Sequence, residues 1–160
     1  MKKNLFLAGL LSASLLVGAA NGHAADWIKN DVDVPNKNVD ANFYDGDSVK
    51  AHAKTLSWTE KFVLTKFGAA TYTKHLSQYP DCKKGIEAKG EVTQHQLDFE
   101  IKGGKFRLVA KRNYNKDNVL VCTDKEMGTE LDKSWKDIAY KTPMYERHYN
   151  LATKYKIGDI

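Results

Sequence analysis

The side chains that could bind a metal or transfer a proton are spread along this chain without a shared spacing. Downstream of residue 24, the histidines are His52, His75, His95 and His148. No two of them form an HxH or HExxH pair, the spacings that turn two imidazoles toward one zinc ion. His75 and His148 instead fall on apolar stripes of helical spacing, which favours packing roles. We therefore expect no metal site among the histidines.

A second group of side chains is similar in composition to a calcium-binding loop: Asp40, Asn42, Asp45 and Asp47. Its spacing departs from the EF-hand pattern, because Tyr44 stands where an oxygen ligand is needed and the glycine comes one residue late. Gly and Asp adopt positive φ at low cost, so residues 45–48 predict a turn and not an ion site.

Motifs of nucleophilic catalysis such as GxSxG do not occur in the sequence. Gly103, Gly104 and Lys105 superficially resemble a phosphate-binding loop, but they join two alternating segments and do not open a helix. The carboxylates show no paired spacing that would indicate acid–base chemistry. We therefore expect a non-catalytic protein that uses no cofactor.

Two cysteines, Cys82 and Cys122, are the only ones in the chain. Their separation is not a CxxC, and no histidine lies within four residues of either, so a redox or metal pair is disfavoured. In an oxidising compartment two such cysteines pair. Closing a loop of about 40 residues stabilises a fold by roughly 4 kcal/mol on the chain-entropy model.

The densest basic group lies between residues 102 and 116. Its members are expected on the outward face of a hairpin: Lys102, Lys105, Arg107 and Lys111, with Arg112 and Lys116 nearby. Such a patch can contact an acidic partner, for example a sulfated glycan, an anionic lipid head group or an acidic protein surface. The same residues are also typical of a solvated sheet face with gatekeeping lysines. The sequence leaves both interpretations open.

The first 24 residues have the organisation of a secretory signal peptide. Lys2 and Lys3 precede an uncharged segment over residues 5–20, and Gly22-His23-Ala24 places small residues at a cleavage site. We expect export to the periplasm, the cell surface or the medium, with no integral membrane anchor. Loss of this segment lowers the formal net charge from +5 to +3, which disfavours nucleic-acid binding.

The rest of the chain predicts one domain over residues 39–160, preceded by a polar entry segment over residues 25–38. Residues 49–64 have strand-like alternation that changes parity, which predicts a bulge or break near Lys54. Residues 67–79 have apolar spacings of three and four, which predict a helix ended by Pro80 and Asp81. Its inward stripe would include Phe67 and His75.

The clearest predicted element is a hairpin over residues 96–111, turning at Gly103-Gly104. Pairing across that turn sets Ile101 opposite Phe106 and Phe99 opposite Leu108 on the buried face. It sets Glu100 opposite Arg107 on the other face, as an opposite-charge pair.

The last element is a helix that Thr142 caps and Pro143 begins, with an inward stripe over Met144, His148, Leu151 and Tyr155. The order of strands, a helix, antiparallel strands and a helix predicts an α+β fold. We expect a small antiparallel sheet packed with a central and a C-terminal helix and closed by one disulfide.

Several of these segments together resemble the surface-adhesin protein E family of small exported bacterial domains. The resemblance covers about residues 39–138 and rests on these segments: Phe43 to Val49, the strand through Trp58, Phe106-Arg107-Leu108 and Trp135 to Ile138. This chain departs from that family in having no cysteine near its C-terminus and in adding the helix from Pro143. The resemblance implies an antiparallel sheet with helices and a binding role outside the cytoplasm.

Two functions are therefore open. The first is a non-catalytic cell-envelope binding protein, similar to small surface adhesins, with a protein or anionic glycan as partner. The second is a periplasmic inhibitor or immunity protein that blocks a toxin or lytic enzyme. An acidic or aromatic loop that protrudes from the domain would favour the second.

Overall fold

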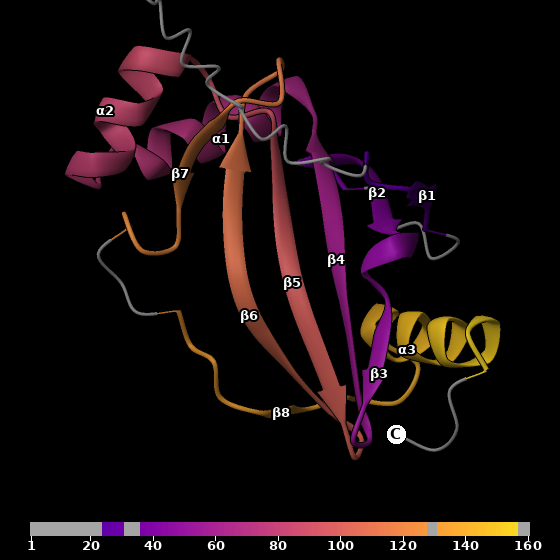
Figure 1. The fold of residues 1–160 in the computed structure, drawn as a ribbon. Helices are drawn as coiled ribbons and strands as arrows, with labels where there is room; N and C mark the ends of the chain where they lie inside the picture. The colour runs from indigo at the N-terminus through magenta and orange to yellow at the C-terminus, as the bar shows by residue number, and fades with distance from the viewer. Residues whose placement is uncertain (1–23, 31–35, 128–130, 157–160) are drawn as a thin grey trace, which may run out of the picture.

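The computed structural model describes residues 24–30, 36–127 and 131–156 and shows an α+β fold (Figure 1). Eight antiparallel strands and three helices are present in these residues, which confirms the predicted α+β class with an antiparallel sheet. The strands are β1 (Trp27–Lys29), β2 (Val39–Asp45), β3 (Lys50–His52), β4 (Thr55–Leu64), β5 (Gln94–Lys102), β6 (Lys105–Tyr114), β7 (Leu120–Thr123) and β8 (Lys136–Asp137). The helices are α1 (Lys66–Leu76), α2 (Pro80–Lys89) and α3 (Pro143–Lys154), with a 3-10 turn η1 (Gly46–Ser48).

Three long strands, β4, β5 and β6, form the centre of the sheet. Both β2 and β3 pair with β4, and both β7 and β8 pair with β6. The strand β1 pairs with β2 at the edge, with Trp27 opposite Asp45. The predicted polar entry segment over residues 25–38 therefore includes a short edge strand at residues 27–29. The predicted signal peptide lies outside the described residues, except for Ala24.

The parity change predicted near Lys54 is a complete reversal of the chain. Ala53 and Lys54 both have positive φ, at 46° and 63°, and they join β3 to β4 as an antiparallel pair. A two-residue turn of this kind needs positive φ at both central positions, and Gly or Asn normally occupies them. The break was predicted at the right place, but residues 49–64 form two strands and not one.

The hairpin of β5 and β6 has the predicted register near its turn. Ile101 lies opposite Phe106, Phe99 opposite Leu108 and Glu100 opposite Arg107. Farther from the turn the register shifts, because Asp98 pairs with Ala110 and leaves Val109 as an extra residue. Beyond this bulge every side chain of β6 points to the face opposite the one that strict alternation assigns.

The predicted central helix is two helices. Pro80 begins α2 instead of ending the helical region, because proline has no amide hydrogen to lose in a first turn. Cys82 therefore lies on α2, and the confirmed Cys82–Cys122 disulfide joins α2 to β7. Within α1 the buried residues include Ala69 and Leu76, whereas Phe67 is 55% exposed and His75 is also exposed. The inward stripe predicted for this helix was wrong at those two positions.

The C-terminal helix α3 begins as predicted. Thr142 accepts a hydrogen bond from the Tyr145 amide, and Pro143 occupies the first turn. Leu151 is buried, while Met144 and Tyr155 pack against the same apolar cluster. The sequence did not indicate Arg147, which this helix also buries.

The three helices pack on one face of the sheet, which we call the covered face. Its larger apolar cluster is built around Tyr44, Leu56, Trp58, Phe99, Ile101 and Leu151. A smaller cluster holds α1 and α2 near the disulfide: Leu76, Cys82, Val92, Val121 and Cys122. Figure 1 shows α1 and α2 together at one end of the sheet and α3 beside β3 and β4. The opposite face, which carries Thr59, Asp98 and Arg112, is called the open face below.

Candidate binding face

The predicted basic patch is not a single cluster of free cations. Lys105 forms an ion pair with Asp137 of β8, and Arg107 pairs with Glu100. Lys102 is exposed beside the hairpin turn. Lys111 lies beyond the Val109 bulge, directly opposite Leu97.

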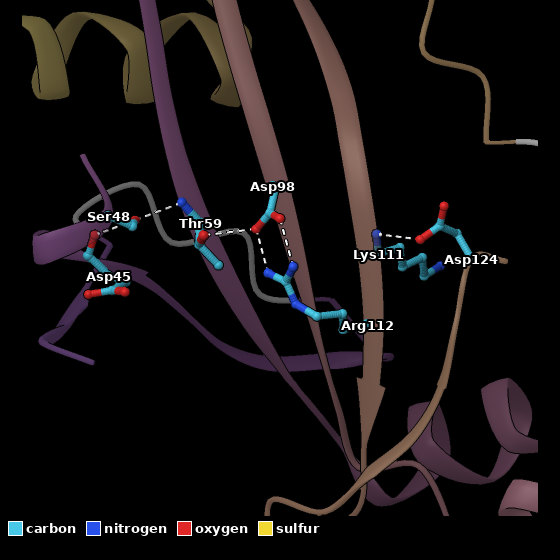
Figure 2. Close-up of polar contacts among 7 residues, drawn as sticks. All are labelled: Asp45, Ser48, Thr59, Asp98, Lys111, Arg112 and Asp124. Carbon is cyan, nitrogen blue, oxygen red and sulfur yellow. Dashed lines mark hydrogen bonds and ion pairs between the residues drawn. The ribbon is translucent and has the colours of Figure 1, made fainter. Parts of the chain in front are cut away.

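Lys111 belongs to the covered face, so its predicted place in the patch was wrong. Its ammonium nitrogen lies 4.6 Å from the centre of the Tyr72 ring of α1. Burial lowers the pKa of the Lys111 ammonium, and the nearby Asp124 carboxylate opposes that effect. The backbone amide of Lys111 donates to Asp124 Oδ1 at 3.1 Å, which ties β6 to the end of β7 (Figure 2).

A chain of hydrogen bonds crosses the open face. Ser48 Oγ accepts from the Thr59 amide at 2.8 Å, and Thr59 Oγ1 donates to Asp98 Oδ1 at 2.8 Å. Arg112 donates from both terminal nitrogens to the two oxygens of Asp98, at 2.7 and 2.5 Å. Figure 2 shows these side chains aligned across η1, β4, β5 and β6. Hydrogen bonding to Asp98 raises the pKa of the already cationic Arg112.

A second ion pair lies nearer the hairpin turn. Arg107 donates from Nε to Glu100 Oε2 at 2.6 Å, and its Nη2 lies 2.5 Å from the same oxygen as an ion pair. Its guanidinium carbon lies 4.7 Å from the centre of the Trp135 ring, so the arginine is held from two sides. Both carboxylates in the middle of this face are therefore neutralised by an arginine on the next strand.

A pocket of about 440 Å³ opens on the same face between β1 and the loop that follows β6. Roughly 300–1,000 Å³ is usual for small-molecule sites. Its lining combines aromatic rings, amides and charged groups: Ala25, Trp27, Asp45, Thr59, Lys61, Gln96, Arg112, Tyr114 and Asn118. The sheet register builds this lining, since Phe43, Lys61, Gln96 and Arg112 are successive cross-strand neighbours.

Lys61 is the cation of this pocket that has no carboxylate partner among the described residues. Its ammonium lies 4.2 Å from the centre of the Trp27 ring and 5.0 Å from that of Phe43. Two aromatic faces attract the charge, and no oxygen acceptor among the described residues binds the ammonium. Partial burial lowers the pKa of Lys61.

The open face therefore combines fixed ion pairs with a polar pocket. Each of the two central carboxylates, Asp98 and Glu100, accepts charge-assisted hydrogen bonds from an arginine on the next strand. In the parts of the chain that the structure describes, no group of three or more His, Cys, Asp or Glu residues is arranged to hold a metal ion.

Sequence reasoning missed Lys61 and Trp27. Trp27 stood in a segment that looked polar and irregular, and Lys61 stood alone among acids and aromatics in β4. A sequence signal did exist for Lys61, because it shares strand parity with Thr59 and not with the apolar Trp58 and Phe62.

A second polar cluster lies on the covered face and was also missed. Glu60 is completely buried, and Arg147 of α3 reaches it with Nη1 3.2 Å from Glu60 Oε2. Trp58 Nε1 donates to Glu60 at 2.9 Å, and Asn42 Nδ2 donates at 3.2 Å. This cluster is closed off from solvent and joins α3 to the sheet.

Searches against protein-family models, curated proteins and solved structures find no match to this chain. Among the helices that the structure describes, none is both long enough and apolar enough to cross a membrane.

Proposed function

We propose that this protein is an exported, non-catalytic binding protein of the cell envelope, of the kind that small bacterial surface adhesins represent, and that the open face is its binding surface. One observation carries the proposal. All three helices pack on the covered face, while the other face presents half-buried polar side chains and a pocket of about 440 Å³. The disulfide supports an oxidising location, because such bonds persist outside the cytoplasm.

The open face differs from an ordinary solvated sheet face in how its charges are held. The side chains of Arg112 and Asp98 are only 29% and 27% exposed to solvent, and the hydrogen bonds between them fix both side chains. Preorganised side chains of this kind lose little conformational entropy when a ligand binds. A solvated face of flexible lysines would lose more conformational entropy on binding a ligand.

The test is to fill the pocket without changing the charge. Gln96→Trp places a large ring among the lining residues in the middle of the open face. Gln78→Trp, at an exposed position of the turn between α1 and α2, is the matched control because it makes the same substitution away from the pocket. Mature protein is immobilised, and its capture of components from cell-envelope and extracellular-matrix preparations is measured. We expect Gln96→Trp to reduce capture by about tenfold, which corresponds to about 1.4 kcal/mol, and the control to retain it. Equal capture by both variants would show that the open face is not the binding surface.

One feature favours the inhibitor or immunity protein as a second candidate. Tyr140 is 70% exposed in the loop between β8 and α3, and its ring packs edge-on against Tyr145 at 5.0 Å. Aromatic side chains on a supported loop are typical anchors of protein interfaces. Protection of a lytic enzyme's target by wild type but not by Tyr140→Ala, with unchanged behaviour of Gln96→Trp, would establish this alternative.

A further inference from the structure

The open-face pocket has an unused positive charge at a fixed place. Arg112 is engaged by Asp98 through both terminal nitrogens, so its charge is largely neutralised. Lys61 has no hydrogen-bond acceptor and no ion-pair partner among the described residues, and its contacts are with the rings of Trp27 and Phe43. An ammonium held this way keeps its N–H groups available for an anionic oxygen.

The groups beside Lys61 match the needs of sugar hydroxyls. A hydroxyl both donates and accepts; the amide side chain of Gln96 offers both functions, and Asn118 offers its amide N–H groups, since its oxygen already accepts from Gln94 Nε2 at 2.5 Å. Asp45 adds an acceptor. Trp27 and Tyr114 each add a ring with one polar group, which suits a ligand that has apolar and polar edges.

Resting on the proposed function, we infer that this pocket binds a sugar unit of an anionic polysaccharide, with the sugar's carboxylate or sulfate on Lys61 and its hydroxyls on Gln96, Asn118 and Asp45. The charge on Lys61 selects for the anion. The mixed donors and acceptors select for a polyhydroxylated ring.

An acidic peptide fits the pocket less well. Peptides that add to a sheet bind through their backbone at a strand edge, with pockets for alternate side chains. This pocket lies over the faces of the strands, and its lining is dominated by polar side chains.

The experiment compares two lysines of the open face. Lys61→Met removes the pocket cation, whereas Lys102→Met removes an exposed cation beside the hairpin turn. Binding of a heparin tetrasaccharide, an alginate tetrasaccharide and the neutral maltotetraose is measured by calorimetry on the mature protein. The heparin arm tests a sulfated host glycan, and the alginate arm tests a carboxylated bacterial polysaccharide. The ε-carbon signal of Lys61 is followed by NMR as an independent report of contact.

We expect one or both anionic tetrasaccharides to bind and to shift the Lys61 signal. Lys61→Met should weaken that binding about tenfold or more, and Lys102→Met less than about twofold. Lys61→Arg, which keeps the charge, should retain more binding than Lys61→Met and so controls for damage to the fold.

Three results would overturn the inference. The first is equal loss in both methionine variants, which would indicate diffuse charge attraction. The second is binding of a tetraglutamate peptide that depends on Lys61 when no saccharide binds. The third is no binding of either anionic tetrasaccharide. If Gln96→Trp still abolishes capture of envelope components in that case, the sugar assignment fails while the open face stands as the binding surface. If capture is also unaffected, both fail.

Discussion

Each face of the sheet has a carboxylate–arginine pair whose carboxylate lies on a central strand, and the two pairs are built differently. On the covered face, Glu60 of β4 pairs with Arg147 of α3, and their side chains are 0% and 8% exposed. On the open face, Asp98 of β5 pairs with Arg112 of β6, and more than a quarter of each side chain is exposed. One pair joins a helix to the sheet, and the other joins two adjacent strands.

Because it is buried, the Glu60 cluster has a role in the stability of the fold. Desolvation raises the pKa of the Glu60 carboxyl, while Arg147 and the donors Trp58, Asn42 and Asn30 oppose that effect. These donors come from β1, β2, β4 and α3 or from their ends, so the cluster fixes four segments at once. Charges removed from water require full pairing, because an uncompensated buried charge is strongly destabilising.

Exposure gives the Asp98 cluster a different role. Water can solvate either partner if the other is removed, so this pair adds little to the stability of the fold. What the pair contributes is position, since Thr59, Asp98 and Arg112 are fixed relative to one another across three strands. The comparison indicates that the Glu60–Arg147 pair of the covered face stabilises the fold, whereas the Asp98–Arg112 pair of the open face fixes the arrangement of surface side chains.

The largest expected effect comes from neutralising the buried carboxylate. Glu60→Gln keeps the size of the side chain but leaves the Arg147 charge without a counter-charge and turns an amide N–H₂ toward existing donors. We expect the free energy of unfolding to fall by about 3–5 kcal/mol, measured by urea denaturation.

A matched change separates this effect from a general loss of charge. Glu146→Gln, on the exposed side of α3, should leave the free energy of unfolding within about 0.5 kcal/mol of wild type. A Glu60→Gln loss below about 1 kcal/mol would mean that the buried pair is worth no more than an exposed one.

The covered face should also make the fold sensitive to acid through His95. Burial, with a smaller contribution from the Lys111 ammonium, lowers the pKa of His95 to about 3 from 6.5. Between these values the unfolded chain binds a proton that the folded chain does not, so stability is full above pH 6.5 and falls as the pH decreases toward 3. The loss should be on the order of 3 kcal/mol at pH 4.

Replacing His95 removes this dependence. Unfolding by urea at pH 7 and pH 4 is compared for wild type and His95→Phe, with His148→Phe as a second variant because burial also lowers the pKa of His148. The difference between the two pH values should shrink most in His95→Phe. If His95→Phe left the difference in the free energy of unfolding between pH 7 and pH 4 unchanged, the pKa of His95 would have to be the same in the folded and unfolded chain.

Local sequence patterns predicted the parts of the fold that depend on near neighbours. The glycine turn, the alternation on either side of it and the cap at Thr142 each set a local geometry, and the structure confirms the turn, the cap and the alternation as far as Leu108. The bulge at Val109 has no such local signal, because all residues around it suit a strand. It reversed the predicted face of Lys111 and divided the expected basic patch.

The candidate site was less predictable because it depends on contacts between distant segments. Trp27 reaches Lys61 only because β1 pairs with β2, and a three-residue strand in a polar segment gives no clear pattern. The burial of Glu60 had a sequence signal, because in a strand it lies on the same face as the buried Trp58 and the half-buried Phe62. Its partner Arg147 lies far along the chain, and a buried arginine on a helix is not distinguishable in sequence from an exposed one.

The smallest expected effect is on the open face, where Asp98→Asn is the counterpart of Glu60→Gln. Asparagine retains one acceptor for Thr59 or Arg112, and the freed guanidinium edge faces solvent. Because water replaces the lost charge-assisted bond, the free energy of unfolding should change by less than about 1 kcal/mol. Capture of envelope components should nevertheless fall, since Arg112 is no longer fixed beside Lys61 in the pocket lining. A variant that loses stability as Glu60→Gln does, with capture intact, would reverse the roles assigned to the two faces: the open pair would hold the fold, and the pocket would not depend on it.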